Sequence, residues 1–139
     1  MNFLPEEDQD FLAAKQITYE LVVERLPDGN ERRGVVFTNF ALDGHLSSIV
    51  AGATQPCRSC GVLVLIPFGY STTRLDSFYT STALKRADGA MPINTAPDHD
   101  LFGRKWQFWS RHLGENEWRA GQDGLDTYLQ YVRAELQKA

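Results

Sequence analysis

The sequence is poor in cysteine, has no excess of basic residues and has no long hydrophobic run. Its 139 residues contain two cysteines, which excludes a disulfide framework and is typical of a reducing compartment. The net charge is -4, whereas a protein that binds nucleic acid usually has a clustered basic surface. The apolar runs are far shorter than the roughly 20 residues that a membrane-spanning helix needs. We therefore expect a protein that binds neither nucleic acid nor membranes.

The N-terminal residues MNFLPEEDQD are acidic and lack the basic segment that opens a secretory signal peptide. This favours a cytoplasmic protein. The length fits one compact domain over residues 1–139, which is large enough to bury a core without disulfides or metals. Apolar residues make up 42% of the chain and charged residues 23%, as in ordinary folded proteins.

The first half of the chain predicts a helix followed by a β-hairpin. Pro5 and the acidic residues after it suit a helix start, which predicts a helix over Glu6–Lys15. Apolar and polar residues then alternate over Ile17–Leu26, as in a strand with one buried face. Asp28-Gly29 is a turn pair, and Arg32–Leu42 predicts the returning strand.

The second half predicts two more strands and a final helix. After a polar connection over 43–60, Gly61–Tyr70 is continuously apolar and predicts a strand covered on both faces. Leu75–Leu84 predicts a fourth strand, and Lys85–Lys105 shows no period and predicts a loop. Asp123 is the expected N-cap of a helix. One face of that helix carries five apolar residues: Leu125, Tyr128, Leu129, Val132 and Leu136. The predicted fold class is α+β, a four-stranded antiparallel meander with an N-terminal and a C-terminal helix.

This order of elements resembles the ubiquitin-conjugating (UBC) fold. The stretch VLVLIPFGY, Val62–Tyr70, is similar to the third-strand motif of that superfamily, and LDSFYTSTAL stands where its fourth strand lies. FGRKWQFWSRH, followed by WRAGQDGLDTYLQYVRAEL, resembles the W-Q-x-W-S-R-H signature of one bacterial branch, the prokaryotic UBC-like family E. The resemblance extends over Leu4–Leu136, and it includes the opening LPEEDQDFL.

The resemblance implies a component of a bacterial ubiquitin-like conjugation system. Its partners would be a ubiquitin-like protein and a ubiquitin-activating-enzyme-like protein. A standard conjugating enzyme of this superfamily carries its partner as a thioester on a cysteine that follows the fourth strand. Thr80–Ala139 contains no cysteine. We therefore expect a module that binds the ubiquitin-like protein noncovalently, with no cofactor and no metal.

Cys57 and Cys60 form a C-x-x-C pair just before the apolar third strand. A zinc site needs two more ligands, and a redox pair is expected at a helix N-terminus. The pattern favours two loop cysteines without a special role. Two alternatives are a redox or metal role and a displaced acceptor for the ubiquitin-like C-terminus. The corresponding function is an active transferase with a non-standard site, which uses Cys57 or Cys60 as the acceptor or His112 as the catalytic group.

His112 stands beside Arg111 in the W-S-R-H run. Histidine titrates near neutral pH, so His112 is a candidate proton-transfer group in a remodelled active site. The pattern favours a structural role, because no nucleophile is identified beside it.

Three tryptophans and two arginines are the candidate partner-binding residues. Tryptophan supplies large contact areas in interfaces but is also common in cores. If the segment is helical, Trp106 and Trp109 share one face, and we expect at least two of the three tryptophans to pack in the core. The third, among Trp106, Trp109 and Trp118, would then be exposed as a partner anchor. Arg111 and Arg119 flank them and would suit an acidic partner or a C-terminal carboxylate.

Overall fold

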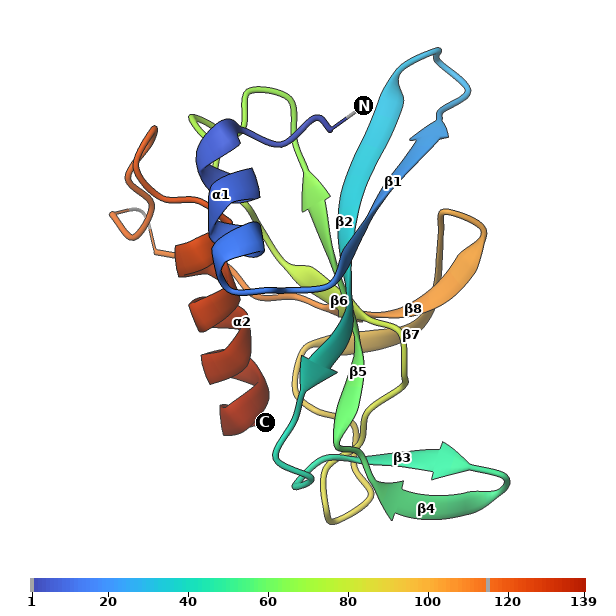
Figure 1. The fold of residues 1–139 in the computed structure, drawn as a ribbon. Helices are drawn as coiled ribbons and strands as arrows, with labels where there is room; N and C mark the ends of the chain where they lie inside the picture. The colour runs from blue at the N-terminus through green and yellow to red at the C-terminus, as the bar shows by residue number, and fades with distance from the viewer. Residues whose placement is uncertain (1, 115) are drawn as a thin grey trace.

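A computed structural model describes residues 2–114 and 116–139 as two helices and eight strands (Figure 1). The helices are α1 (Glu6–Ala14) and α2 (Leu125–Lys138). The strands are β1 (Tyr19–Arg25), β2 (Glu31–Ala41), β3 (Ser47–Val50), β4 (Ala53–Pro56), β5 (Ser59–Ile66), β6 (Phe78–Thr80), β7 (Thr95–Leu101) and β8 (Arg104–Trp109). Neither helix in this part of the chain is long and apolar enough to cross a bilayer.

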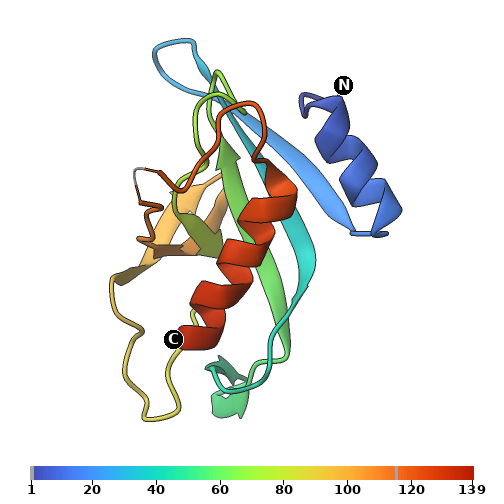
Figure 2. The ribbon, with the colours of Figure 1, turned by 90° about the vertical axis from the view of Figure 1, so that its left-hand side faces the viewer.

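The predicted fold class is confirmed. Six strands form one antiparallel sheet in the order β1-β2-β5-β6-β8-β7, and β3 pairs with β4 in a separate hairpin. The four strands expected from the sequence are β1, β2, β5 and β6, which lie side by side as a meander. Both helices lie on the same side of this sheet (Figure 1), and a second view shows α2 running across the strands (Figure 2).

The prediction of irregular structure over 85–105 and 43–60 was wrong. The first segment contains β7 and the start of β8, which extend the sheet beyond four strands, and the second contains β3 and β4. These strands are largely solvent-exposed: all four residues of β4 are exposed, and so are four of the seven in β7. A strand without a buried face needs no alternation of apolar and polar residues, so the usual sequence pattern is missing.

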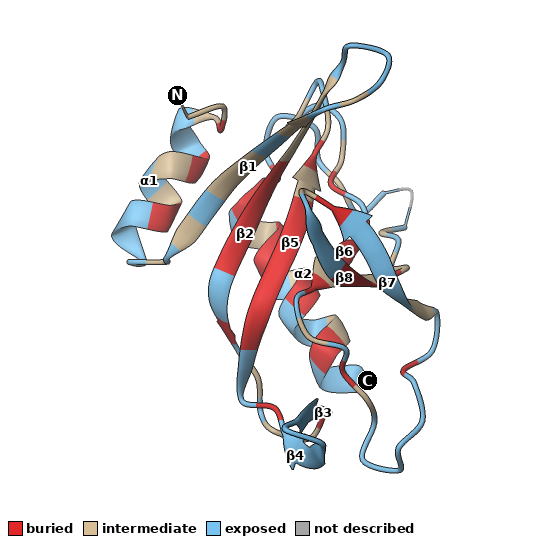
Figure 3. Ribbon diagram, turned by 90° about the vertical axis from the view of Figure 1, so that its right-hand side faces the viewer, coloured by how far each residue is buried: buried red, intermediate tan, exposed pale blue. Residues whose placement is uncertain are grey.

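Each face of the sheet carries its own buried cluster. The larger cluster lies between the sheet and the helices, where Phe37 and Val64 meet Leu12 of α1 and Leu129 of α2. The smaller one lies on the opposite face and consists of Val36, Leu63, Leu101 and Trp106. Neighbouring residues of β2 and β5 point to opposite faces and both sides are covered, so these central strands are buried over most of their length (Figure 3).

The start of α2 is capped from α1. Gly124, and not Asp123 as expected, is the N-cap residue, so the predicted cap was wrong by one position. Asp8 of α1 lies at this helix end, and its Oδ1 accepts a hydrogen bond of 3.2 Å from the Leu125 backbone N–H. Its Oδ2 accepts a hydrogen bond of 2.5 Å from the Tyr70 hydroxyl. The Asp8 side chain therefore joins α1, α2 and the segment after β5, and it is 5% exposed.

Acidification is expected to stabilise the wild-type protein relative to an Asp8→Asn variant. Burial raises the pKa of the Asp8 carboxyl above its usual range, although the hydrogen bond from Tyr70 acts in the opposite direction. The folded chain then binds this proton more tightly than the unfolded chain. The stabilisation is complete below the unfolded pKa and is lost as the pH rises through the folded pKa.

Urea unfolding from neutral pH down to about pH 4 measures the difference in free energy of unfolding between the wild type and Asp8→Asn. The matched control is Asp10→Asn, which changes an exposed carboxyl of the same helix. The raised pKa of Asp8 is contradicted if the free energy of unfolding of the wild type, relative to that of Asp8→Asn, stays constant or falls on acidification.

Candidate functional site

Both cysteines lie inside the main core. Cys57 is 7% exposed and Cys60 6% exposed, and neither is joined in a disulfide. Burial, together with the neighbouring Cys57, raises the pKa of the Cys60 thiol to about 12. The Cys57 Sγ donates a hydrogen bond of 3.2 Å to the Ser59 carbonyl. At neutral pH the Cys60 thiol is therefore protonated, and both sulfur atoms are shielded from an approaching carbonyl group.

Trp106 and Trp109 are core residues on opposite faces of the sheet. Both lie on β8, so a spacing of three residues turns their side chains in opposite directions. Trp106 is 2% exposed in the smaller cluster, and Trp109 is fully buried in the larger one. The expectation that two of the three tryptophans pack in the core is confirmed. The expectation of a shared helical face was wrong, because this segment is a strand.

The other three candidate partner-binding residues differ in accessibility. The Arg111 side chain is 10% exposed, lies over the Trp109 ring and pairs with Glu135 of α2 at 3.1 Å. Trp118 is half-buried, and its Nε1–H donates a hydrogen bond of 2.9 Å to the Ser71 carbonyl. The Arg119 side chain is 65% exposed. Of the five candidates, Trp118 and Arg119 therefore offer accessible surface to a partner.

His112 lies between a carboxylate and a hydroxyl. Its Nδ1 lies 2.8 Å from Oδ1 of Asp76, and its Nε2 lies 3.3 Å from Oγ of Ser110. The structure thus places a hydroxyl, that of Ser110, beside His112, where the sequence analysis identified no nucleophile. The His112 and Asp76 side chains are 64% and 50% exposed, so this cluster faces solvent.

Buried hydrogen bonds hold the two segments of this cluster together. The Ser77 N–H donates to the Arg111 carbonyl at 3.0 Å, and the Tyr128 hydroxyl of α2 donates to the Ser77 carbonyl at 2.5 Å. Ser77 has a φ of 55°, a left-handed conformation that costs energy for a residue with a side chain. The tight bonding around Ser77 keeps the chain in this conformation and fixes the position of Asp76 beside it.

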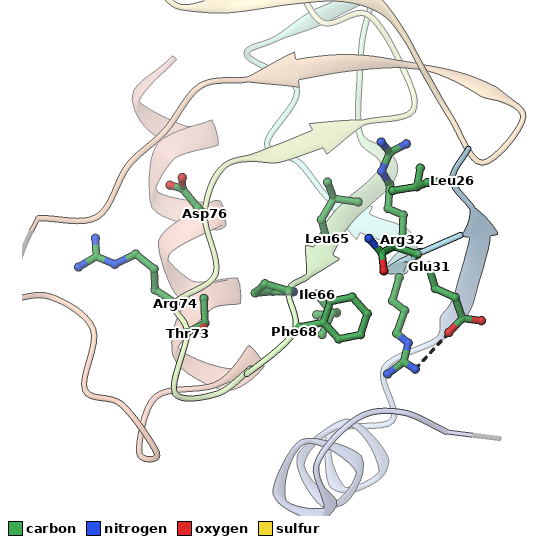
Figure 4. Close-up of a pocket in the computed structure, with 12 residues that line it drawn as sticks. Leu26, Glu31, Arg32, Leu65, Ile66, Phe68, Thr73, Arg74 and Asp76 are labelled. Carbon is green, nitrogen blue, oxygen red and sulfur yellow. Dashed lines mark hydrogen bonds and ion pairs between the residues drawn. The ribbon is translucent and has the colours of Figure 1, made fainter. Parts of the chain in front are cut away.

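A groove of about 640 Å³ has Asp76 of this cluster among its lining residues (Figure 4). It lies between the β1–β2 turn and the β5–β6 loop, residues 67–77. The Phe68 ring is 66% exposed there, and the Arg33 guanidinium lies 5.5 Å from its centroid. Arg74 and Asp76 lie at the end opposite Leu26. Asp76 therefore belongs both to the groove and to the histidine cluster.

The residues at 2–114 and 116–139 include no group of three or more His, Cys, Asp or Glu side chains placed to hold a metal ion. The side chains that meet at the His112 cluster are a hydroxyl, an imidazole and a carboxylate. Sequence reasoning identified His112 but neither Ser110 nor Asp76. A signal for Ser110 was present, because residues two apart on an extended chain point the same way. Asp76 is 36 positions from His112, and no local pattern joins them.

A helix, an antiparallel meander and a C-terminal helix are the arrangement of the UBC-like fold. The family model described as Prokaryotic E2 family E matches residues 4–139, and the chain belongs to this family. Membership makes the chain a UBC-fold component of a conjugation system, with partners from a ubiquitin-like pathway in general. No curated protein and no solved structure matches the chain.

Proposed function

We propose that this protein holds a ubiquitin-like protein noncovalently and does not carry it as a cysteine thioester. The observation that carries the proposal is the burial of both cysteines, 7% and 6% exposed. Thioester formation needs an accessible thiolate, and the raised pKa of Cys60 opposes its ionisation. Family membership supplies the class of partner.

The surface around the β5–β6 loop provides the contacts for such a partner. Phe68 lies in the groove on this loop, and Trp118 packs against the same loop through Ser71. Exposed aromatic and arginine side chains are the usual anchors of protein interfaces. The Arg119 guanidinium, close in sequence to Trp118, uses one of its five donors on Asp123. The remaining donors suit a C-terminal carboxylate.

The proposal is tested by a charging assay together with a binding measurement. The protein is mixed with the ubiquitin-like protein and the activating-enzyme-like protein of the same organism, with ATP, and the products run on reducing and non-reducing gels. Binding of the ubiquitin-like protein is measured by calorimetry. We use a Cys57→Ala, Cys60→Ala double variant, because serine would place a hydroxyl in the core.

We expect no band that disappears on reduction, and equal binding by the wild type and the double variant. Phe68→Ala should weaken binding by about tenfold or more, as for an interface anchor. Ile49→Ala, which removes an apolar side chain that is 60% exposed on β3, is the matched control. A reducible band that is absent in the double variant contradicts the proposal. That result would assign the transferase role to Cys57 or Cys60.

A further inference from the structure

We propose that Ser110, His112 and Asp76 form an acyl-transfer site in which the Ser110 hydroxyl is the nucleophile. Its substrates are carboxylic esters and thioesters. This activity goes beyond noncovalent binding, which requires no chemistry at Ser110. It also differs from a cysteine thioester, because the covalent intermediate is an oxygen ester.

The three side chains stand in the order that acyl transfer requires. Asp76 Oδ1 lies 2.8 Å from Nδ1 of His112, which favours the tautomer with its proton on Nδ1. The Nε2 lone pair is then free to accept the proton of Ser110, whose Oγ lies 3.3 Å away. Contacts between nucleophile and base are often this long before a substrate binds.

The local chain explains why the serine and the histidine meet. Arg111, between them, turns inward, where its side chain lies over Trp109 and pairs with Glu135. Successive side chains of an extended segment alternate in direction, so Ser110 and His112 both turn outward. Asp76 approaches from the neighbouring segment, which Ser77 holds against Arg111.

The reaction needs no oxidant and no metal. As the Ser110 Oγ attacks the substrate carbonyl carbon, its proton passes to Nε2 of His112. The bond from that carbon to the leaving oxygen or sulfur breaks, and the leaving group takes the proton from His112. The product is an acyl ester of Ser110. Water then attacks the ester carbonyl carbon and gives a proton to Nε2 of His112. The bond from that carbon to the Ser110 Oγ breaks, Oγ takes the proton from His112, and the carboxylic acid leaves.

The surroundings suit a large acyl substrate. His112 and Asp76 are accessible from solvent, and the groove that contains Phe68 ends at Asp76 (Figure 4). On the other side, the Ser110 N–H donates to the Asn94 carbonyl at 2.9 Å, and the preceding Ile93 is 75% exposed.

The test uses an alkyl fluorophosphonate, which reacts with activated serines. The Ser110 Oγ–P bond forms, the P–F bond breaks, and the hydroxyl proton and fluoride leave. The full chain is incubated with the probe, and intact mass and peptide mapping locate the adduct. We expect one adduct on Ser110. It should be lost in Ser110→Ala and form at least about 100-fold more slowly in His112→Asn, as expected for loss of a general base.

Asp76 is tested as a positioning residue. Asp76→Asn should slow labelling, and Asp76→Glu, which keeps a carboxylate acceptor, should recover part of the rate. The controls are Ser59→Ala and His99→Asn, which change an exposed serine and an exposed histidine elsewhere in the sheet. The changed side chains are exposed, apart from the half-buried Ser110, so circular dichroism should show folded variants. Absence of an adduct on Ser110 overturns the proposal, and so does an adduct that His112→Asn forms at the wild-type rate.

Discussion

Replacing Trp109 with alanine is expected to lower the free energy of unfolding by about 3–5 kcal/mol, as for other large aromatic residues removed from cores. The side chain is fully buried and stacks on Phe78, with 5.6 Å between ring centroids. It also carries the Arg111 guanidinium on its face, 5.1 Å from the centroid. Truncation leaves a cavity between the sheet and α2 and removes the surface on which Arg111 lies.

Denaturant unfolding of the two proteins measures this loss. Trp118→Ala is the matched comparison, because that indole is only half-buried and borders the same cluster. We expect a clearly smaller loss of stability from Trp118→Ala but weaker binding of the ubiquitin-like partner. Equal losses from the two variants would show that the distinction between core and surface tryptophan is wrong.

The elements with one buried face were predictable from the sequence, and the exposed ones were not. In β1, Glu20 separates Tyr19 and Leu21, which both pack against the main core, and in α2 the apolar residues recur with the helical period, so both patterns identify their elements. The sequence of β7, TAPDHDL, is polar because this edge strand lies in solvent. β7 forms by pairing with β8, and the seven residues of β7 alone carry no pattern that predicts this pairing.

The W-Q-x-W-S-R-H run shows the same limit at the level of the site. Its first four residues, 106–109, belong to β8 and pack into both cores. The last three, 110–112, follow the end of β8, and their side chains point outward, inward and outward in turn. The sequence analysis considered this run as a helix, in which residues three or four apart share a face. In the extended chain residues two apart share a face, so the proximity of Ser110 and His112 was missed. Asp76 lies on another segment, and its position follows from how Ser77 is held.

Gln107→Leu is expected to cost about 1–3 kcal/mol for each of the two Leu84 backbone groups that it leaves without a partner. The Gln107 side chain is 2% exposed. Its Oε1 accepts a hydrogen bond of 2.9 Å from the Leu84 N–H, and its Nε2 donates one of 3.0 Å to the Leu84 carbonyl. Oε1 also accepts from the Trp109 Nε1–H at 3.2 Å. Leucine keeps most of the volume but makes none of these bonds.

The matched control is Gln55→Leu, which makes the same chemical change on the exposed strand β4. We expect urea unfolding to show a large loss for Gln107→Leu and almost none for Gln55→Leu. A loss below about 1 kcal/mol at Gln107 would contradict the prediction, because it would mean that Leu84 finds other partners. The expected result would show that a glutamine side chain holds the segment after β6 against β8. Because Ser110 directly follows β8, the hydrogen bonds of Gln107 also help to position Ser110 of the candidate acyl-transfer site.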